Sequence, residues 1–474
     1  MKKKLLLTLM ALLACSATLF AYDFEVDDIY YNKLSDNTVA VKGANTLDAS
    51  LVIPDTVVWL GNVYRVTVVA DSAFKNATCI TYLSIGVNVA SIGSAAFDGC
   101  TSLSRIDCNS LLNMPELQDS LTFGPCYNKA LVYVPHWAVD RYRAAPYWSL
   151  FGYQIRGRDY DIKQDRLYFW IDGIDSHECG LVAPEVHWFN GNLVVPATVT
   201  AEGETFTVIT VSFFRCESLS SITLPPTIKE LWWDIFVDCY ADIKISDLAA
   251  WCGIEFSGPS SYEEDFSTGW DPGRHELYLN NEKVSHLVIP DEVTAIQPYS
   301  FYSITNIDRI TIHDAVTTIG WGAFCNMRGL KRLTLGSGLT SIGHEAFACI
   351  GKDILYGYGY PIDAIVCKAL EPPILEDNTC FSCYDDAILY VPASSLEDYS
   401  SHEIWGQFTH IVPFIGAGPG DVDGDGEINI DDVTGLIDQL LFGEELPAYI
   451  DVDGDGAVDI NDVTMLIDML LGLR

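Results

Sequence analysis

A phenylalanine, usually preceded by a small residue, recurs along the chain at a spacing of 23 residues. These anchors fall into three local arrays, namely Phe74 and Phe97, Phe213 and Phe236, and Phe301, Phe324 and Phe347. A fixed period of this size is typical of solenoids, in which each unit is too short to bury its apolar face and stacks on its neighbours instead. The repeat therefore predicts stacked units with the anchor rings on the inside.

The positions around each anchor keep the same register. An aliphatic residue stands five positions before every anchor, at Val69, Ile92, Val208, Leu231, Ile296, Ile319 and Ile342. The stretch that follows an anchor alternates between polar and apolar residues, as in Arg332–Leu335, and this alternation is the period of a half-buried strand. We therefore expect ladders of short strands around an apolar core.

The array is built twice. Its opening motif at Tyr22 is echoed at Tyr160, and the aromatic-rich ending after Leu131 is echoed after Leu389. Because an open solenoid end exposes core and strand edges, each array needs a cap. We predict two capped solenoid blocks, a Gly- and Pro-rich linker and a tail, at residues 22–157, 158–415, 416–420 and 421–474.

Residues 1–21 have the order of a secretory signal peptide. Lys2–Lys4 are followed by an uncharged apolar stretch and by Ala21 before the polar mature sequence. This order predicts export and cleavage. Lipid attachment at Cys15 is the alternative. No later segment is long and apolar enough to predict a membrane span in the mature chain.

Charge and motifs disfavour several function classes. The chain has 27 Lys and Arg against 65 Asp and Glu, a formal net charge of −38, which repels nucleic acid and attracts cations. It has no His-Glu-x-x-His, no Gly-x-Ser-x-Gly and no phosphate-binding glycine loop. Among so many carboxylates, chance pairs that mimic a glycosidase site are expected. We therefore predict a protein that is not an enzyme.

The repeat units resemble a known family. Ile92–Leu103 has the form Ile-Gly-x-x-Ala-Phe-x-x-Cys-x-x-Leu, and Ile342–Phe347 fits the same pattern. These units look like BspA-like leucine-rich repeats. The resemblance covers most of residues 22–415. It implies a β-rich leucine-rich-repeat solenoid in a secreted or surface-exposed bacterial adhesion protein, and it names no particular ligand.

The tail contains two nearly identical twelve-residue segments, which start 30 residues apart. Each places oxygen-bearing side chains at loop positions 1, 3, 5, 9 and 12, has glycine at position 6 and offers a backbone carbonyl at position 7, as calcium loops do. The crowded carboxylates repel one another until a divalent cation binds. We predict two Ca²⁺ sites, formed by Asp421, Asp423, Asp425, Glu427, Asn429 and Asp432, and by Asp451, Asp453, Asp455, Ala457, Asp459 and Asp462.

Each loop is followed by a stripe of apolar residues at helical spacing. The stripes, which we expect to pack against each other, are Val433, Leu436, Ile437, Leu440 and Leu441, and Val463, Leu466, Ile467, Leu470 and Leu471. Paired loop-and-helix segments of this length resemble a type I dockerin, a small all-α calcium-binding module with paired EF-hand-like loops. The resemblance implies docking to a cohesin-like module through loop positions 10 and 11. In this chain those positions are Ile430, Asp431, Ile460 and Asn461, in place of the hydroxyl pair that is familiar in the family. The alternative is a purely structural calcium clip with no partner.

Three arginines are candidates for ligand binding on the solenoid. Arg309 and Arg332 occupy the same outward strand position in adjacent units, and Arg105 is equivalent to them in the first block. On so acidic a chain, stacked basic residues would attract an anionic ligand. The alternative is a solvated sheet face.

The tryptophans and cysteines each have more than one structural or functional interpretation. Trp232, Trp233, Trp251 and Trp270 either form a glycan-stacking platform or pack in the core and loops. The cysteines three residues after the anchors, Cys100, Cys216 and Cys239, fit buried thiols, because other units have apolar residues there. Cys380 and Cys383 fit either a redox pair or a structural disulfide near the second cap that could include Cys367, and we expect the structural disulfide because nothing around them resembles a thioredoxin unit.

Together these features predict a binding and adhesion protein at the outer surface of a bacterium or in its surroundings. The solenoid would bind a protein or glycan ligand, and the calcium-dependent tail would dock to another protein. The alternative is an accessory subunit, or a hydrolase with an unrecognised site, in a polysaccharide-degrading complex.

Overall fold

The computed structural model describes residues 22–183, 189–212, 218–232, 239–257, 274–348, 362–414, 422, 428–442, 452 and 458–471. The chain divides into two compact units, Met1–Pro184 with Thr198–Val208, and Glu185–Ala197 with Ile209–Arg474. The predicted leader, residues 1–21, lies outside the described residues. Within the described part of the chain, no helix combines the length and the apolar character needed to cross a bilayer.

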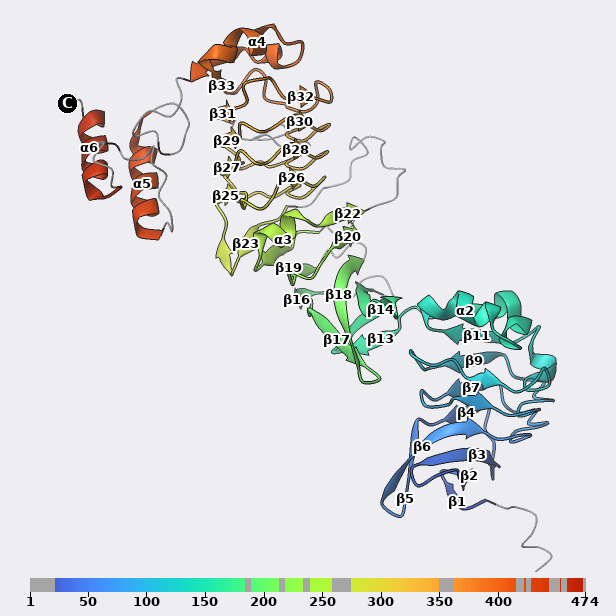
Figure 1. The fold of residues 1–474 in the computed structure, drawn as a ribbon. Helices are drawn as coiled ribbons and strands as arrows, with labels where there is room; N and C mark the ends of the chain where they lie inside the picture. The colour runs from blue at the N-terminus through green and yellow to red at the C-terminus, as the bar shows by residue number, and fades with distance from the viewer. Residues whose placement is uncertain are drawn as a thin grey trace, which may run out of the picture. The chain divides into compact units, whose positions relative to one another are not determined.

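The first unit contains two facing sheets that form the walls of the solenoid (Figure 1). One sheet has the order β1-β2-β3-β6-β8-β10, with β5 paired to β6, and the other has the order β12-β11-β9-β7-β4. The strands of the first sheet are β1 Phe24–Val26, β2 Ile29–Lys33, β3 Thr38–Ala44, β5 Thr56–Trp59, β6 Asn62–Val69, β8 Ser91–Ile92 and β10 Glu116–Leu117. Those of the second are β4 Ser50–Ile53, β7 Tyr82–Ile85, β9 Arg105–Cys108, β11 Leu131–Val134 and β12 Ile155–Gly157. Pairing is antiparallel where the array opens and parallel once the repeat begins.

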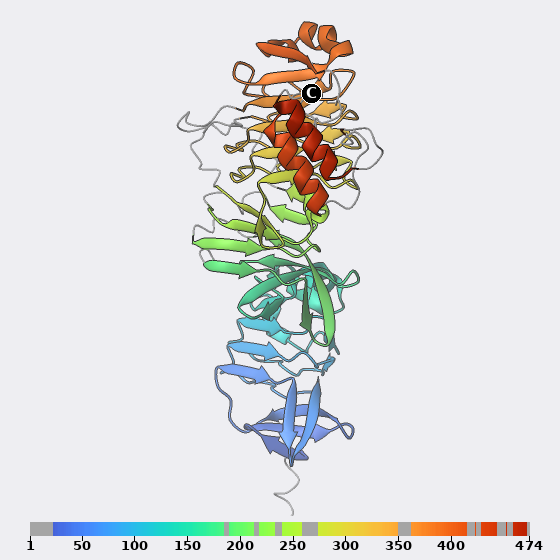
Figure 2. The same cartoon turned by 90° about the vertical axis from the view of Figure 1, so that its left-hand side faces the viewer.

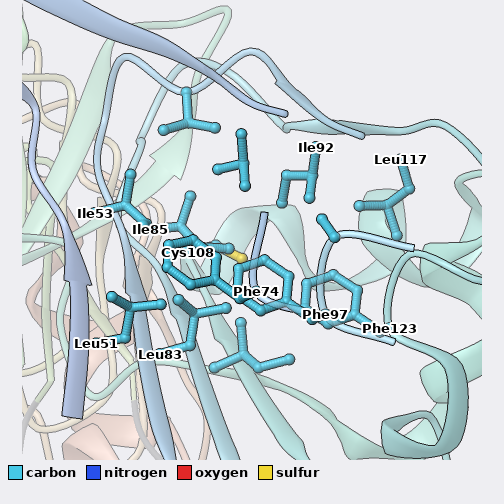
Figure 3. Close-up of a cluster of buried hydrophobic side chains, with 14 of the residues drawn as sticks. Leu51, Ile53, Phe74, Leu83, Ile85, Ile92, Phe97, Cys108, Leu117 and Phe123 are labelled. Atoms are coloured by element: carbon cyan, nitrogen blue, oxygen red, sulfur yellow. The ribbon is translucent and has the colours of Figure 1, made fainter. Parts of the chain in front are cut away.

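The core between these walls contains a column of stacked phenylalanine rings (Figure 3). The ring centroids of Phe74 and Phe97 lie 5.4 Å apart, and those of Phe97 and Phe123 lie 5.2 Å apart. Aliphatic residues from successive strands, such as Leu83 and Ile92, surround the column and are fully buried. The predicted anchors Phe74 and Phe97 are therefore inside, as the repeat requires.

An aromatic cap closes the first block. It consists of η2 His136–Ala138, α2 Val139–Ala144 and η3 Trp148–Gln154, which follow β11 in the chain. The indole N–H of Trp148 donates to the carbonyl of Pro115 at 2.7 Å, so this buried side chain has its polar atom satisfied. The capped end predicted from the aromatic-rich sequence is present.

After this cap the opening pattern of the chain recurs. The strands are β13 Ile162–Gln164, β14 Leu167–Gly173, β15 Glu178–Val182, β17 Thr198–Ala201 and β18 Glu204–Ser212. β13, β14 and β15 pair in antiparallel order, and β17 and β18 form a hairpin. Residues 158–183 belong to the first compact unit, together with the block that precedes them.

The second unit continues the solenoid as two successive pairs of sheets. In the first pair, one sheet contains β16 Gly191–Val194, β19 Leu219–Thr223, β21 Asp242–Ile245, β23 Leu277–Leu279 and β24 Glu282–Lys283. The other sheet contains the end of β18 with β20 Glu230–Trp232 and β22 Glu255–Ser257. The short helix α3 spans Leu248–Cys252. The next pair of sheets contains β25 His286–Val288, β27 Arg309–Thr311, β29 Arg332–Leu335, β31 Ala364–Cys367, β33 Ile388–Pro392 and β34 His410–Phe414, facing β26 Ala295–Ile296, β28 Thr318–Ile319, β30 Ser341–Ile342 and β32 Ile374–Leu375. All strand pairs within this last pair of sheets are parallel.

A second phenylalanine column fills the space between these last sheets. Phe301, Phe324, Phe347 and Phe381 stack with centroid distances of 5.2, 5.2 and 5.1 Å and nearly parallel rings. Phe213 and Phe236, the other predicted anchors, lie outside the described residues. The second cap comprises η6 Ala393–Ser395, α4 Leu396–Ser401 and η7 Trp405–Gln407. Its Trp405 indole donates to a backbone carbonyl of the preceding loop, as Trp148 does in the first cap.

The tail forms two helices, α5 Ile430–Phe442 and α6 Ile460–Leu470, which pack side by side (Figures 1 and 2). Their shared core consists of Val422, Val433, Leu436, Val452, Val463 and Leu466. The fold is therefore a β-rich leucine-rich-repeat solenoid followed by a small all-α module, as predicted.

The expected disulfide near the second cap is wrong. Cys367 and Cys380 are free and buried. The Cys367 thiol lies 3.1 Å from the Tyr399 hydroxyl, and the Cys380 thiol faces the carbonyl of Ile342 at 3.6 Å. Cys100 is buried as expected, with its thiol 3.2 Å from the carbonyl of Phe74. These thiols occupy inward repeat positions, where neighbouring units supply apolar side chains.

Candidate functional sites: the tail loops and the solenoid faces

The first tail loop is closed by the aspartate at position 12. Asp432 is fully buried, and its two carboxylate oxygens accept the backbone N–H groups of Val422 and Asn429, each at 2.7 Å. These amides belong to positions 2 and 9 of the loop. One side chain therefore ties the start of the loop to its end and to the first turn of α5.

The second loop repeats this arrangement. Asp462 is fully buried and accepts the amides of Val452 and Asp459, again at 2.7 Å each. Asp459 in turn caps α6, because its carboxylate accepts the amide of Asn461 at 2.7 Å. In the first loop the Asn429 side chain accepts the amide of Asp431 in the same way. The same hydrogen bonds thus recur at positions 2, 9, 11 and 12 of both loops.

Only part of the predicted ligand set can be placed. Asn429, Asp432, Asp459 and Asp462 lie in the described residues and come together as pairs at the base of each loop. The remaining predicted ligands lie outside the described residues, namely Asp421, Asp423, Asp425, Glu427, Asp451, Asp453, Asp455 and Ala457. Among the described residues alone, no cluster of three or more His, Cys, Asp or Glu side chains could hold a metal ion. The placed residues fit the oxygen-only chemistry of a calcium loop.

Sequence reasoning missed the role of loop position 2. Val422 and Val452 are buried in the tail core, and their amides are the donors to the position-12 aspartates. An apolar residue between two loop carboxylates was the available signal. The buried valine side chain anchors the loop to the helices, while the N–H of the same residue donates to the position-12 aspartate.

The predicted apolar stripes are buried only in part. Val433, Leu436, Val463 and Leu466 form the shared core, and Leu440 packs against it. Ile437, Leu441, Ile467, Leu470 and Leu471 are instead 37–66% exposed. The stripes therefore pack against each other through their inner residues only, because two helices with one contact line cannot cover the outer positions.

The predicted docking positions are exposed. Ile430 and Ile460 are 67% and 66% exposed, large values for isoleucine. Each is the first residue of its helix, and Asp431 and Asn461 follow it. Asn461 is exposed as well, whereas Asp431 is half-buried and lies beside Arg332.

Two of the three candidate arginines lie side by side. Arg309 on β27 and Arg332 on β29 are direct partners in the parallel register, with His286 of β25 on the other side of Arg309. Burial and the charge of Arg309 lower the pKa of His286. A carboxylate oxygen of Asp431 lies 3.1 Å from a guanidinium nitrogen of Arg332. The predicted stack of basic residues on this sheet face is present.

Arg105 differs, because its charge is matched within its own sheet. Its guanidinium donates two hydrogen bonds to Asp107, at 2.8 and 3.0 Å, and lies 4.3 Å from the ring centroid of Tyr133. The hydroxyl of Tyr82 also donates to Asp107, at 2.9 Å. The charge of Arg105 is therefore matched by Asp107 on its own strand, whereas the carboxylate beside Arg332 comes from Asp431 at the start of α5.

The tryptophans do not form a common platform in the described residues. Trp251 is 2% exposed, and its indole donates to the carbonyl of Ser300 at 3.0 Å, so it is a core residue. Trp232 is 41% exposed on β20. Trp233 and Trp270 lie outside the described residues. Core packing therefore accounts for Trp251.

Comparison with protein families identifies both parts of this architecture. The BspA-type leucine-rich repeat model matches in six copies, over residues 65–128, 197–250 and 274–353. The dockerin type I model matches residues 419–471, the segment with the two closed loops. The chain carries BspA-type leucine-rich repeats and a dockerin type I domain. Dockerin type I domains generally bind calcium, and the two modules together support a protein-binding or docking role.

A search of solved structures returned bacterial repeat proteins of low sequence identity. A leucine-rich cell surface protein from Faecalibacterium prausnitzii is 19% identical, with 82% of this chain and 94% of that chain covered and a TM-score of 0.29. A leucine-rich repeat protein from Bacteroides ovatus is 15% identical, with 83% and 100% covered and a TM-score of 0.27. The pneumococcal vaccine antigen PcpA is 12% identical, with 82% and 98% covered and a TM-score of 0.25. A search of curated proteins gave no match.

Proposed function

We propose that this chain is a secreted or surface-displayed bacterial binding protein with no catalytic activity of its own. Its leucine-rich-repeat solenoid binds a protein or glycan ligand, and its dockerin attaches it to a cohesin-like module when calcium is bound. The duplicated closure of the tail loops carries this proposal. Asp432 and Asp462 are buried at equivalent positions and each accept two backbone amides.

The dockerin would hold two calcium ions, one in each loop. Burial strips a carboxylate of its hydration, and a divalent cation bound beside it compensates for that loss. The described residues Asn429, Asp432, Asp459 and Asp462 would contribute from the base of the loops. The other predicted ligands complete two oxygen-only sets with a backbone carbonyl at position 7, which suits Ca²⁺ better than softer metals.

The exposed first turns of α5 and α6 would contact the docking partner. Ile430 and Ile460 offer apolar side chains, and Asp431 and Asn461 supply polar atoms beside them. Calcium is then required indirectly, because it fixes the loops from which these turns start. The matched families do not favour the alternative role as an accessory or hydrolytic subunit of a polysaccharide-degrading complex.

The paired arginines Arg309 and Arg332 mark one candidate ligand-binding face of the solenoid, and Arg105 marks its counterpart in the first block. The predicted leader, residues 1–21, would direct export. The mature chain would then comprise the two blocks 22–157 and 158–415, the linker 416–420 and the dockerin 421–474.

Capture of a type I cohesin module tests the docking role. The full mature chain is passed over immobilised cohesin with calcium and again with a chelator, and retention only with calcium is expected. The double variant Ile430→Lys with Ile460→Lys should lose capture yet keep calcium binding, because neither side chain is a loop ligand. Retention of this variant, or capture that persists in chelator, would exclude the proposed docking face.

A further inference from the structure

Two hairpins occupy equivalent places at the start of the two arrays. In β5–β6 the cross-strand pairs are Thr56–Arg65 to Trp59–Asn62, and in β17–β18 they are Thr198–Thr207 to Ala201–Glu204. Both hairpins turn through two residues with positive φ, Leu60-Gly61 and Glu202-Gly203. The hairpins are therefore structural repeats of each other, and their tips can be compared residue by residue.

The tip of the second hairpin has a partner inside the first unit. One carboxylate oxygen of Glu202 accepts the backbone N–H of Leu111 at 2.7 Å, and the other accepts the hydroxyl of Ser110 at 3.2 Å. Ser110 and Leu111 lie in the loop between β9 and β10, and they are only 4% and 5% exposed. This loop is thus the receptor for a hairpin tip.

The tip of the first hairpin is apolar and uncovered. Leu60 is 78% exposed, and the cross-strand pair Val58 and Val63 beside it is 59% exposed at each residue. The backbone of Leu60 has a φ of 50°, which a leucine adopts at a cost and which Asn, Asp or Gly adopt more readily. An exposed leucine in such a turn suggests a contact that this side chain makes with another molecule.

A second copy of the receptor loop exists in the second unit. The loop between β31 and β32 is equivalent to the loop between β9 and β10, since Trp405 donates to Pro373 as Trp148 donates to Pro115. Leu370 follows β31 by three residues, as Leu111 follows β9. Leu370 is nevertheless 64% exposed, and Ile374 nearby is 71% exposed. The receptor loop is therefore uncovered in one array and covered in the other.

We propose that the chain assembles head to tail, with the β5–β6 hairpin of one copy seated on the β31–β32 loop of a second copy. The contact would repeat the one already formed within the first unit between the β17–β18 hairpin and the β9–β10 loop. Leu60 replaces Glu202 at the tip, so an apolar contact with Leu370 replaces the two hydrogen bonds. Because the two surfaces differ, the contact is heterologous and generates open chains of molecules rather than closed dimers.

Single exposed apolar residues are common on proteins and carry no weight alone. The proposal rests on the correspondence between two repeated pairs of surfaces. One pair is joined within the chain, and the other pair is left apolar and exposed. A second copy of the same chain is the occupant that supplies both missing partners at once.

Analytical ultracentrifugation of the full mature chain in calcium tests this assembly. Wild-type protein should form a concentration-dependent series of oligomers. Leu60→Asn suits the positive φ of the turn and removes the apolar tip, while Leu370→Asn removes the apolar receptor, and each alone should be monomeric. A mixture of the two variants retains one intact hairpin and one intact loop, so it should form a one-to-one dimer and nothing larger. Val288→Thr, at another exposed valine, should assemble as the wild type does.

The outcomes separate this assembly from others. A wild-type chain that is monomeric at every concentration would refute the proposal. Oligomers that survive both asparagine substitutions would place the interface elsewhere, including on the dockerin, and would also refute it. A one-to-one dimer confined to the mixture of variants supports the head-to-tail contact, since no two-fold symmetric interface would give that pattern.

Discussion

Replacement of Phe324 by alanine tests whether the phenylalanine column holds the solenoid together. Phe324 is fully buried and stacks on Phe301 and Phe347, at 5.2 Å on each side. Loss of a buried phenylalanine costs about 3–5 kcal/mol, and each aromatic pair contributes about 0.5–1.5 kcal/mol beyond its buried area. With two pairs broken, we expect a loss near the upper end of that range.

Hydrogen exchange measured by mass spectrometry suits this test, because long repeat arrays unfold locally and a single melting temperature describes them poorly. Amides of β27, β29 and β30 should exchange faster by roughly a hundredfold or more, since each 1.4 kcal/mol is a factor of about ten. Amides around Phe74 and Phe97 in the first unit serve as the internal reference. Val288→Ala, at a position that is 52% exposed, is the matched control.

This reasoning would be refuted if amide exchange in β29 became slower, or if it became faster by less than tenfold. It would mean that the ring column is a consequence of the strand ladders and contributes little to their stability.

Three further outcomes are expected. Trp148→Phe should lower the free energy of unfolding of the first block by about 1–3 kcal/mol in urea titration, because the buried carbonyl of Pro115 loses its donor; an unchanged midpoint would contradict the role assigned to that hydrogen bond. Burial raises the pKa of Cys108 and of Cys126 to about 12. Brief alkylation of the native chain at neutral pH should therefore label the exposed Cys79 before either of them, as read by peptide mass spectrometry. Equal labelling of the three cysteines would show that the core is open. The hydrogen bond from Ser94 lowers the pKa of Asp119. The stabilisation that this hydrogen bond gives is therefore fully present above the ordinary pKa of aspartate and is lost as pH falls through the lowered value. Ser94→Ala should raise the Asp119 pKa in a carboxyl NMR titration, and an unmoved pKa would assign the shift to other contacts.

The repeat period predicted the solenoid because the same local sequence pattern occurs in every unit. Phe123 and Phe381 were missed as members of the ring columns, since they follow the preceding anchors by 26 and 34 residues and the period breaks there. Both rings lie where the array meets its cap. Unit length changes at such junctions, although the stacking distance does not.

In the tail, the sequence predicted the elements themselves better than it predicted which of their residues are buried. Spacing alone predicted both loops and both helices, and Asp432 and Asp462 are buried at the predicted position. Spacing could not say which apolar residues face inward. Leu441 and Leu471 lie on the predicted stripe and are 66% exposed each, because the contact between two helices depends on how they cross, which a helical period does not encode.

The disulfide expectation failed for a related reason. Cys367 and Cys380 are close in the sequence to the cap, but each occupies an inward position of a repeat unit and faces a different neighbour. Repeat register was the better guide to these cysteines than proximity along the chain.

Isothermal titration of Ca²⁺ into the chelator-treated mature chain tests the central claim most directly. The account predicts binding of two ions per chain, with one site lost in Asp432→Ala and one in Asp462→Ala, because each aspartate closes its own loop. Absence of binding at millimolar calcium, or unchanged binding in the variant that carries both substitutions, would contradict the assignment of these loops as calcium sites.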